Sequence, residues 1–168
     1  MKDNFSNVAI NYSKFRPGYP KELLDFILHH CENKNCAWDC GTGNGQVAKE
    51  LSKYFNKVIA SDISQQQLNQ AYQASNIEYR LESGENCSID DQSLDLITVA
   101  QAIHWFDFNG FYTHVYRVLK PGGIIAVWAY NNPVLEGILN DSLLEIYEDT
   151  LGAYWDPERQ YITDGYET

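Results

Sequence analysis

Three glycines stand within five residues in the stretch A-W-D-C-G-T-G-N-G-Q, residues 37–46. Glycine loses more backbone entropy on folding than any other residue, so such a cluster in an ordered segment requires a structural reason. The cluster follows a short apolar run and precedes a helical pattern. It therefore predicts a tight strand-to-helix turn in which the backbone takes positive φ angles or approaches a ligand closely.

Short apolar runs alternate with helical patterns along the chain. Strands are predicted at residues 36–40, 57–62, 77–82, 93–100 and 124–130, and helices from Pro20, from Gly45, after Ser64, at 109–119 and at 134–151. Ser64 and Gln67 match a capping box, in which two side chains satisfy each other's backbone N–H groups. The alternation predicts an α/β fold, a Rossmann-like doubly wound parallel sheet in the order 3-2-1-4-5. Ligands of such sheets bind outside the carboxyl ends of the strands.

Two acidic residues belong to this edge of the predicted sheet. Asp39 directly precedes the glycines, where a carboxylate repels a pyrophosphate but suits a positively charged amino-acid group. Asp62 ends the second strand, where a carboxylate accepts hydrogen bonds from ribose hydroxyls. A nucleoside with a cationic tail describes S-adenosylmethionine. Two alternatives stay open, a plain strand-to-helix turn and a dinucleotide site of the G-x-G-x-x-G type.

Composition and cysteine spacing exclude several classes of partner. A formal net charge of -11 argues against nucleic acid or an anionic membrane as the main partner. The four cysteines form no C-x-x-C pair, so we expect no metal site. On one strand Cys36 and Cys40 would lie about 13 Å apart, too far for a disulfide, which predicts reduced thiols and a cytoplasmic protein. No apolar run approaches the ~20 residues of a membrane span.

Five motifs in order resemble the class I S-adenosylmethionine-dependent methyltransferases. They are D-C-G-T-G-N-G, S-D-I-S, S-G-E-N, S-L-D-L-I-T-V-A-Q-A and L-K-P-G-G. The segments Y-S-K-F-R-P-G-Y-P and A-I-H-W-F-D narrow the resemblance to a small-molecule branch that includes trans-aconitate methyltransferase-like proteins. The resemblance covers residues 5 to about 150. It implies methyl transfer to a small organic molecule, such as a carboxylic acid, with S-adenosyl-L-homocysteine as the product.

The resemblance also implies a role for each matching residue at the cofactor site. Asp39, Gly41 and Gly43 line the methionine end, while Thr42, Asn44 and Gly45 shape the loop. Asp62 holds the ribose, Ile63 packs on the adenine, Gly84 and Glu85 lie at the adenine edge, and Gln101 and Ala102 line the floor under the sulfonium. For Glu85 a plain surface position is the alternative.

The acceptor pocket is expected between residues 102–106 and 12–19, because it must open beside the sulfonium. Within these segments we predict two catalytic residues. Arg16 would grip a carboxylate of the substrate, and His104 would act as a base for a phenol or an amine. The alternatives are that Arg16 only holds the N-terminal segment to the body and that His104 only packs in the core.

The whole chain, residues 1–168, is expected to form one methyltransferase domain. Its parts would be a lid at 1–19, a Rossmann-like core at 20–151 and a polar, truncated tail at 152–168. The family's sheet has two further strands, which would follow the last helix of this sequence. The fifth predicted strand would then lie at an exposed edge, which invites a homodimer, covering by the C-terminal segment, or aggregation. The alternative function is a protein that binds S-adenosylmethionine or its product without turnover, because its sheet is incomplete.

Overall fold

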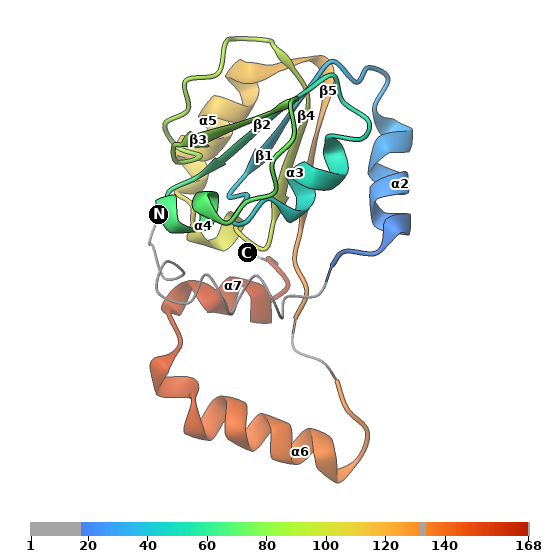
Figure 1. The fold of residues 1–168 in the computed structure, drawn as a ribbon. Coiled ribbons are helices and arrows are strands. Elements are labelled where there is room, and N and C mark those ends of the chain that lie inside the picture. Colours follow the sequence, from blue (N-terminus) through green and yellow to red (C-terminus); the bar gives the residue numbers. More distant parts are fainter. Residues whose placement is uncertain (1–17, 132–133, 168) are drawn as a thin grey trace. The chain divides into compact units, whose positions relative to one another are not determined.

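The computed structural model describes residues 18–131 and 134–167 of the chain (Figure 1). These residues fall into two compact units, one that ends at Trp128 and one that starts at Ala129. The first unit contains a sheet with helices, and the described part of the second contains helices alone. The predicted lid lies almost entirely outside the described residues, and the single domain stays a prediction.

The first unit is built on a five-stranded parallel sheet in the order β3-β2-β1-β4-β5. Its strands are β1 (Cys36–Cys40), β2 (Lys57–Asp62), β3 (Ile77–Leu81), β4 (Leu94–Ala100) and β5 (Leu119–Trp128). The central strand β1 pairs with both β2 and β4, so that Trp38 lies between Ile59 and Ile97. The predicted fold class and strand order are confirmed. Because all strands are parallel, their carboxyl ends meet at one edge.

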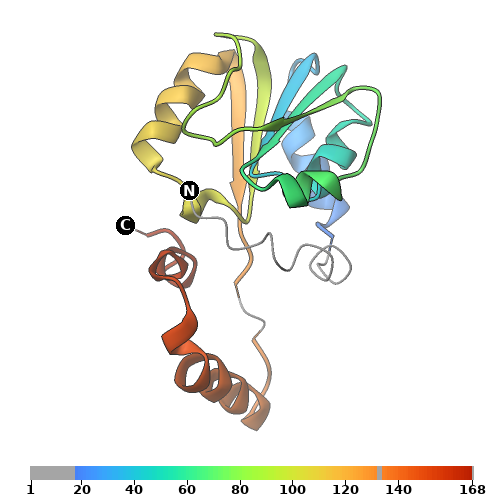
Figure 2. The same cartoon turned by 60° about the vertical axis from the view of Figure 1, so that its left-hand side comes forward.

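Helices cover both faces of this sheet (Figures 1 and 2). On one face α2 (Lys21–His30) and α3 (Gln46–Leu51) bury apolar side chains against alternate residues of the strands. On the other face α5 (Phe108–Val118) packs Phe111 toward Trp38, with 6.2 Å between the ring centroids. Trp38 is fully buried, and its indole Nε1 donates to Ser61 Oγ at 2.9 Å. The position of β4 between two cores explains why all its residues are buried, on both faces of the sheet.

Several element boundaries differ from the prediction. Helix α4 (Gln65–Asn69) ends early, and the Tyr72 carbonyl farther along accepts a hydrogen bond from the Tyr79 hydroxyl of β3. Strand β5 begins at Leu119, so the L-K-P-G-G segment extends the strand rather than only ending a helix. An edge strand tolerates Pro121 because no ladder partner there needs its missing N–H group.

The second unit contains α6 (Ile138–Leu144), a π-helical segment η3 (Glu145–Thr150) and short turns. The turns are η4 (Gly152–Tyr154), η5 (Pro157–Arg159) and α7 (Gln160–Thr163). The predicted helix at 134–151 thus begins only after Gly137, whose φ is +60°. No helix among residues 18–131 and 134–167 is both long and apolar enough to cross a membrane.

Strand β5 forms one edge of the sheet, as predicted. Its side chains are half-buried or exposed, and Val127 is 39% exposed. A homodimer through this edge stays a prediction.

At the amino ends of the strands, the buried carboxylate of Asp95 in β4 contacts the neighbouring strands on both sides. Its Oδ2 accepts from the backbone N–H groups of Asn35 and Cys36, at 2.7 and 2.9 Å. Its Oδ1 accepts from Lys120 Nζ at 2.6 Å, which brings in β5. Burial alone would raise the pKa of Asp95, but these hydrogen bonds lower it below its ordinary value.

We expect Asp95→Ala to lower the free energy of unfolding by about 2–3 kcal/mol, because it leaves the partly exposed ammonium of Lys120 and two part-buried N–H groups without their acceptor. The matched control is Asp91→Ala, which removes an exposed carboxylate paired with Arg117 at 2.7 Å. That change should cost less than about 1 kcal/mol. Urea unfolding measures both, and equal losses would contradict the proposed role of Asp95.

Candidate functional site

The glycine-rich turn after β1 is the centre of the candidate site. Gly41, Gly43 and Gly45 all have positive φ angles, of 70°, 56° and 78°, as predicted. A Cβ atom added at Gly41 would lie only 2.6 Å from the Cβ of Ala102, and one at Gly45 would collide with the Tyr79 hydroxyl. Glycine is therefore required here both by the backbone conformation and, at two positions, by space.

Backbone hydrogen bonds hold this loop over the end of β2. The N–H groups of Gly41 and Thr42 both donate to the carbonyl of Ser61, each at 2.9 Å. The N–H of Gly45 donates back to the Thr42 carbonyl at 3.0 Å and closes the turn before α3. The loop is thus folded by its own contacts.

Asp39 lies fully buried beneath the loop. Its Oδ1 accepts from Thr98 Oγ1 at 2.9 Å, and its Oδ2 accepts from Thr42 Oγ1 at 2.5 Å and from the Ala48 N–H at 3.1 Å. Burial raises the pKa of Asp39 to about 6, although the three hydrogen bonds favour the charged form. The carboxylate therefore fixes the loop from behind, and contact with the methionine end of a cofactor stays a prediction.

Asp62 stands beside the loop at the end of β2. Its Oδ2 accepts from the Gly43 N–H at 2.8 Å and its Oδ1 from the Ser64 N–H at 2.9 Å. Its charge contributes to the raised pKa of Asp39. The structure thus brings the two predicted acids and the glycines together, with Ile63 half-buried directly after Asp62.

The predicted capping box at α4 forms only in part. The Ser64 hydroxyl accepts from the Gln67 backbone N–H at 3.3 Å, as expected of an N-cap. The return bond is missing because Asp62 takes the Ser64 N–H. Gln67 is 2% exposed, and its Oε1 has no hydrogen-bond partner in the part of the chain described.

Near the same edge, two further buried polar atoms have no hydrogen-bond partner within residues 18–131 and 134–167. They are Oε1 of Gln46, the residue that follows the glycine loop, and Nε1 of Trp128, the last residue of β5. Buried polar groups without a hydrogen bond are rare in proteins and call for a missing ligand or water. Sequence reasoning missed both residues, although their positions directly after a loop and at a strand end were a usable signal.

The segment after β4 forms the neighbouring wall. Gln101 has a positive φ of 57°, unusual for a residue other than glycine, and its N–H donates to the Trp128 carbonyl at 2.9 Å. Ala102 packs against Gly41. His104 is 5% exposed on the 3-10 turn η2 (Ile103–Trp105), and its ring centroid lies 4.9 Å from that of Trp105.

Two predicted residues at the adenine edge make contacts of their own. A Cβ at Gly84 would lie 2.9 Å from Cys40 Sγ and 3.1 Å from the Phe111 ring, so close packing explains the glycine. Glu85 Oε1 accepts from the Asp107 N–H at 3.0 Å, at the start of α5. Their roles at the adenine stay predictions. Arg16 lies outside the described residues.

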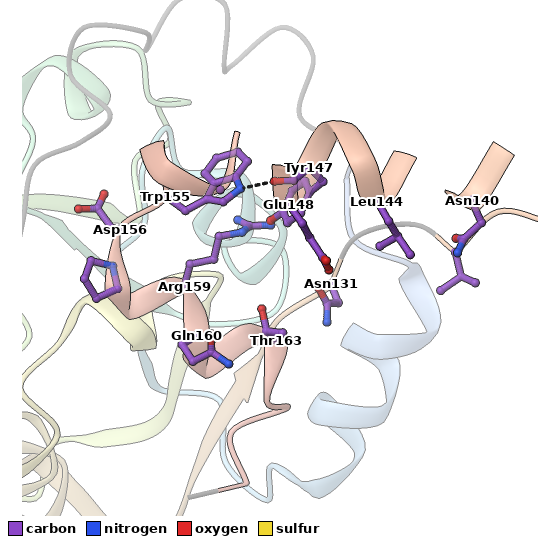
Figure 3. A pocket seen from close by; sticks show the side chains of 13 residues that line it. Asn131, Asn140, Leu144, Tyr147, Glu148, Trp155, Asp156, Arg159, Gln160 and Thr163 are labelled. Carbon is purple, nitrogen blue, oxygen red and sulfur yellow. Dashed lines mark hydrogen bonds between the residues drawn. The ribbon is translucent and has the colours of Figure 1, made fainter. Parts of the chain in front are cut away.

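The second unit contains a cavity of about 700 Å³ (Figure 3). The Arg159 guanidinium stands over the rings of Tyr147 and Trp155, at 4.8 and 4.7 Å from their centroids. Trp155 Nε1 donates to the Tyr147 carbonyl at 3.0 Å. The cavity has the size of pockets that bind organic ligands, but no predicted site residue lines it.

Comparison with known proteins identifies the first unit. Residues 38–127 match the family model described as a methyltransferase domain. A Dictyostelium discoideum protein named as a methyltransferase is 41% identical over 98% of this chain and 64% of the relative. A Saccharomyces cerevisiae protein named as an S-adenosylmethionine-dependent methyltransferase is 29% identical over 99% of this chain and 61% of its own length.

A solved structure from Anaeromyxobacter dehalogenans, described as a type II methyltransferase, has the same fold. It is 31% identical, with a TM-score of 0.79 over 91% of this chain and 65% of that one. The chain thus spans less than two thirds of the length of each of these three proteins.

The buried carboxylate predicts a specific dependence of stability on pH. Folding raises the pKa of Asp39 from about 3.9 to about 6, so the folded state holds its proton more tightly. Its contribution to stability is therefore full below about pH 4 and is lost as the pH rises to about 6, by roughly 3 kcal/mol. Asp39→Asn, which does not titrate, should lack this contribution.

Urea unfolding of both proteins between pH 4 and 7 measures the effect. The informative quantity is the difference between wild type and variant, since other carboxyl groups titrate in the same range. A difference that stays constant over this range would contradict the raised pKa.

Proposed function

This chain belongs to the methyltransferase-domain family, and on that basis we propose that it binds S-adenosylmethionine and transfers the methyl group to a small organic molecule. The observation that carries the proposal is the carboxyl edge of the sheet. There a preformed glycine loop follows β1, and the carboxylate of Asp62 ends β2. Buried polar atoms of Gln46, Gln67 and Trp128 have no hydrogen-bond partner among the described residues.

The chemistry of these residues fits the cofactor. The glycine loop allows backbone contact, and a carboxylate at the end of β2 suits ribose hydroxyls. The negative charges of Asp39 and Asp62 favour a ligand with a sulfonium and an ammonium group over a pyrophosphate, which counts against a dinucleotide. The loop needs no rearrangement to form, because Ser61 and Asp39 already hold it.

Bound S-adenosylmethionine supplies a methyl group on a cationic sulfur, which an acceptor displaces in line to leave S-adenosyl-L-homocysteine. The protein's contribution is then to position the acceptor and to keep water out. For this we propose the segment from Ala102 to Phe106, with His104 as a base where the acceptor is a phenol or an amine. A carboxylate acceptor needs no base.

A small organic acceptor, such as a carboxylic acid, is supported by the motifs Y-S-K-F-R-P-G-Y-P and A-I-H-W-F-D, as in the branch with trans-aconitate methyltransferase-like proteins. A cytoplasmic location is supported by the free thiols of all four cysteines. The alternative function is cofactor binding without turnover. Methyl transfer from labelled S-adenosylmethionine to a panel of small carboxylic acids distinguishes the two.

Asp62→Ala should weaken binding of S-adenosylhomocysteine about 10- to 150-fold, because a hydrogen bond to a charged group contributes roughly 1.5–3 kcal/mol. Asp90→Ala, at an exposed acid outside the site, is the matched control and should leave affinity unchanged. Calorimetric titration measures both. A wild type that binds a nicotinamide dinucleotide instead of S-adenosylhomocysteine would overturn the proposed function.

His104→Ala should lower turnover or acceptor affinity. The affinity for S-adenosylhomocysteine should stay within about two-fold of wild type, a change of less than ~0.5 kcal/mol in binding free energy. We expect the same of Arg16→Ala. His30→Ala, at an exposed residue of α2, serves as the control. A parallel loss of cofactor binding and turnover in the His104 variant would assign that residue to the scaffold.

A further inference from the structure

The side chain of Gln67 points to a contact that neither the fold nor the cap requires. Gln67 is 2% exposed, and its Oε1 is buried without a hydrogen-bond partner among the residues described. That oxygen lies 4.0 Å from the place where a Cβ atom on Gly43 would stand. The carboxamide is therefore directed to the glycine loop rather than to solvent.

Local hydrogen bonding explains why this carboxamide is available. In a complete capping box it would accept from the Ser64 N–H. Asp62 Oδ1 already accepts from that N–H at 2.9 Å, so the cap is complete without the Gln67 side chain. A carboxamide oxygen that is buried without a hydrogen bond is destabilising, so a ligand or a water must compensate.

The neighbours of the carboxamide indicate which ligand group it meets. The Gly43 N–H donates to Asp62 Oδ2 at 2.8 Å, which places a carboxylate beside the same glycine. Two acceptor oxygens near one loop residue suit two adjacent hydroxyl groups, since each hydroxyl can donate to one of them. A ribose presents such a pair.

We propose that the Gln67 carboxamide hydrogen-bonds one ribose hydroxyl of the cofactor while Asp62 binds the other. This inference rests on the proposed function and adds a specificity-determining residue to it. Because an amide can both donate and accept, Gln67 serves whichever direction the hydroxyl adopts. The two side chains together would distinguish a ribose from a deoxyribose.

The test is a calorimetric titration of the full chain with S-adenosylhomocysteine and with its 2′-deoxy, 3′-deoxy and inosine analogues. The variant is Gln67→Met, which keeps the side-chain shape but removes the hydrogen bond. Gln66→Met, at the exposed preceding position of α4, is the matched control. For each protein the readout is the ratio of the affinity for S-adenosylhomocysteine to the affinity for each analogue. This ratio is used because methionine at position 67 also alters packing and hence the absolute affinity.

In wild type and in the Gln66 variant, loss of the contacted hydroxyl should weaken binding about five- to ten-fold. In Gln67→Met the same loss should be less than about two-fold, and the protein without ligand should melt no lower than wild type. Equal factors in wild type and Gln67→Met would overturn the inference. The inference would also be overturned if Gln67→Met changed only the affinity for the inosine analogue. A clearly lower melting temperature of the Gln67→Met variant without ligand would overturn it too, because it would indicate that Gln67 has a structural partner such as buried water.

The result separates this inference from the proposed function. A wild type that fails to bind S-adenosylhomocysteine overturns the function, and the inference falls with it. If the wild type binds S-adenosylhomocysteine and Gln67→Met does not change how much the deoxy analogues weaken binding, the proposed function stands. Only the role of Gln67 is then removed.

Discussion

One buried carboxylate, that of Asp39, sets the geometry on which the carboxyl edge of the sheet depends. Its two oxygens hold three donors that lie far apart in the sequence, Thr42 in the loop, Ala48 in α3 and Thr98 in β4. Without the carboxylate the Thr42 hydroxyl and the Ala48 N–H would be buried unsatisfied, at about 1–3 kcal/mol each. Thr98 Oγ1 would keep only its 3.4 Å hydrogen bond to the Trp38 carbonyl. The charge that makes these bonds strong is also unfavourable to bury, and burial therefore raises the pKa of Asp39 to about 6.

The fold was largely predictable because strand length and apolar runs are local signals. The expected strand at 57–62 is β2 to the residue. The misses have tertiary causes. The pattern after Ser64 predicts a longer helix than α4, but the Tyr79 hydroxyl of β3 engages the Tyr72 carbonyl instead. The proline and glycines after Leu119 signal a helix end, and nothing local shows that an edge strand can include them.

The candidate site was predictable where chemistry follows from residue type and spacing, as for Asp39, Asp62 and the glycines. Gln67 matches a capping box in the sequence. Only the structure shows that the Ser64 N–H donates to Asp62 instead, so that the Gln67 side chain is not used in the cap. Such competition between acceptors depends on distances in three dimensions. That Trp128 Nε1 has no hydrogen-bond partner among the described residues is equally invisible in a sequence, where the residue resembles any aromatic side chain of a strand.

The central position of β1 affects how the chain can fold while the ribosome synthesises it. This strand is made first, yet both of its neighbours come later, and Ala37 must wait for Leu96. At 5–20 residues per second, translation of the intervening residues takes roughly 3–12 seconds. During that time the side of β1 that pairs with β4 stays without its partner strand. Chaperones that recognise such nascent segments would therefore have their longest opportunity at residues 36–40.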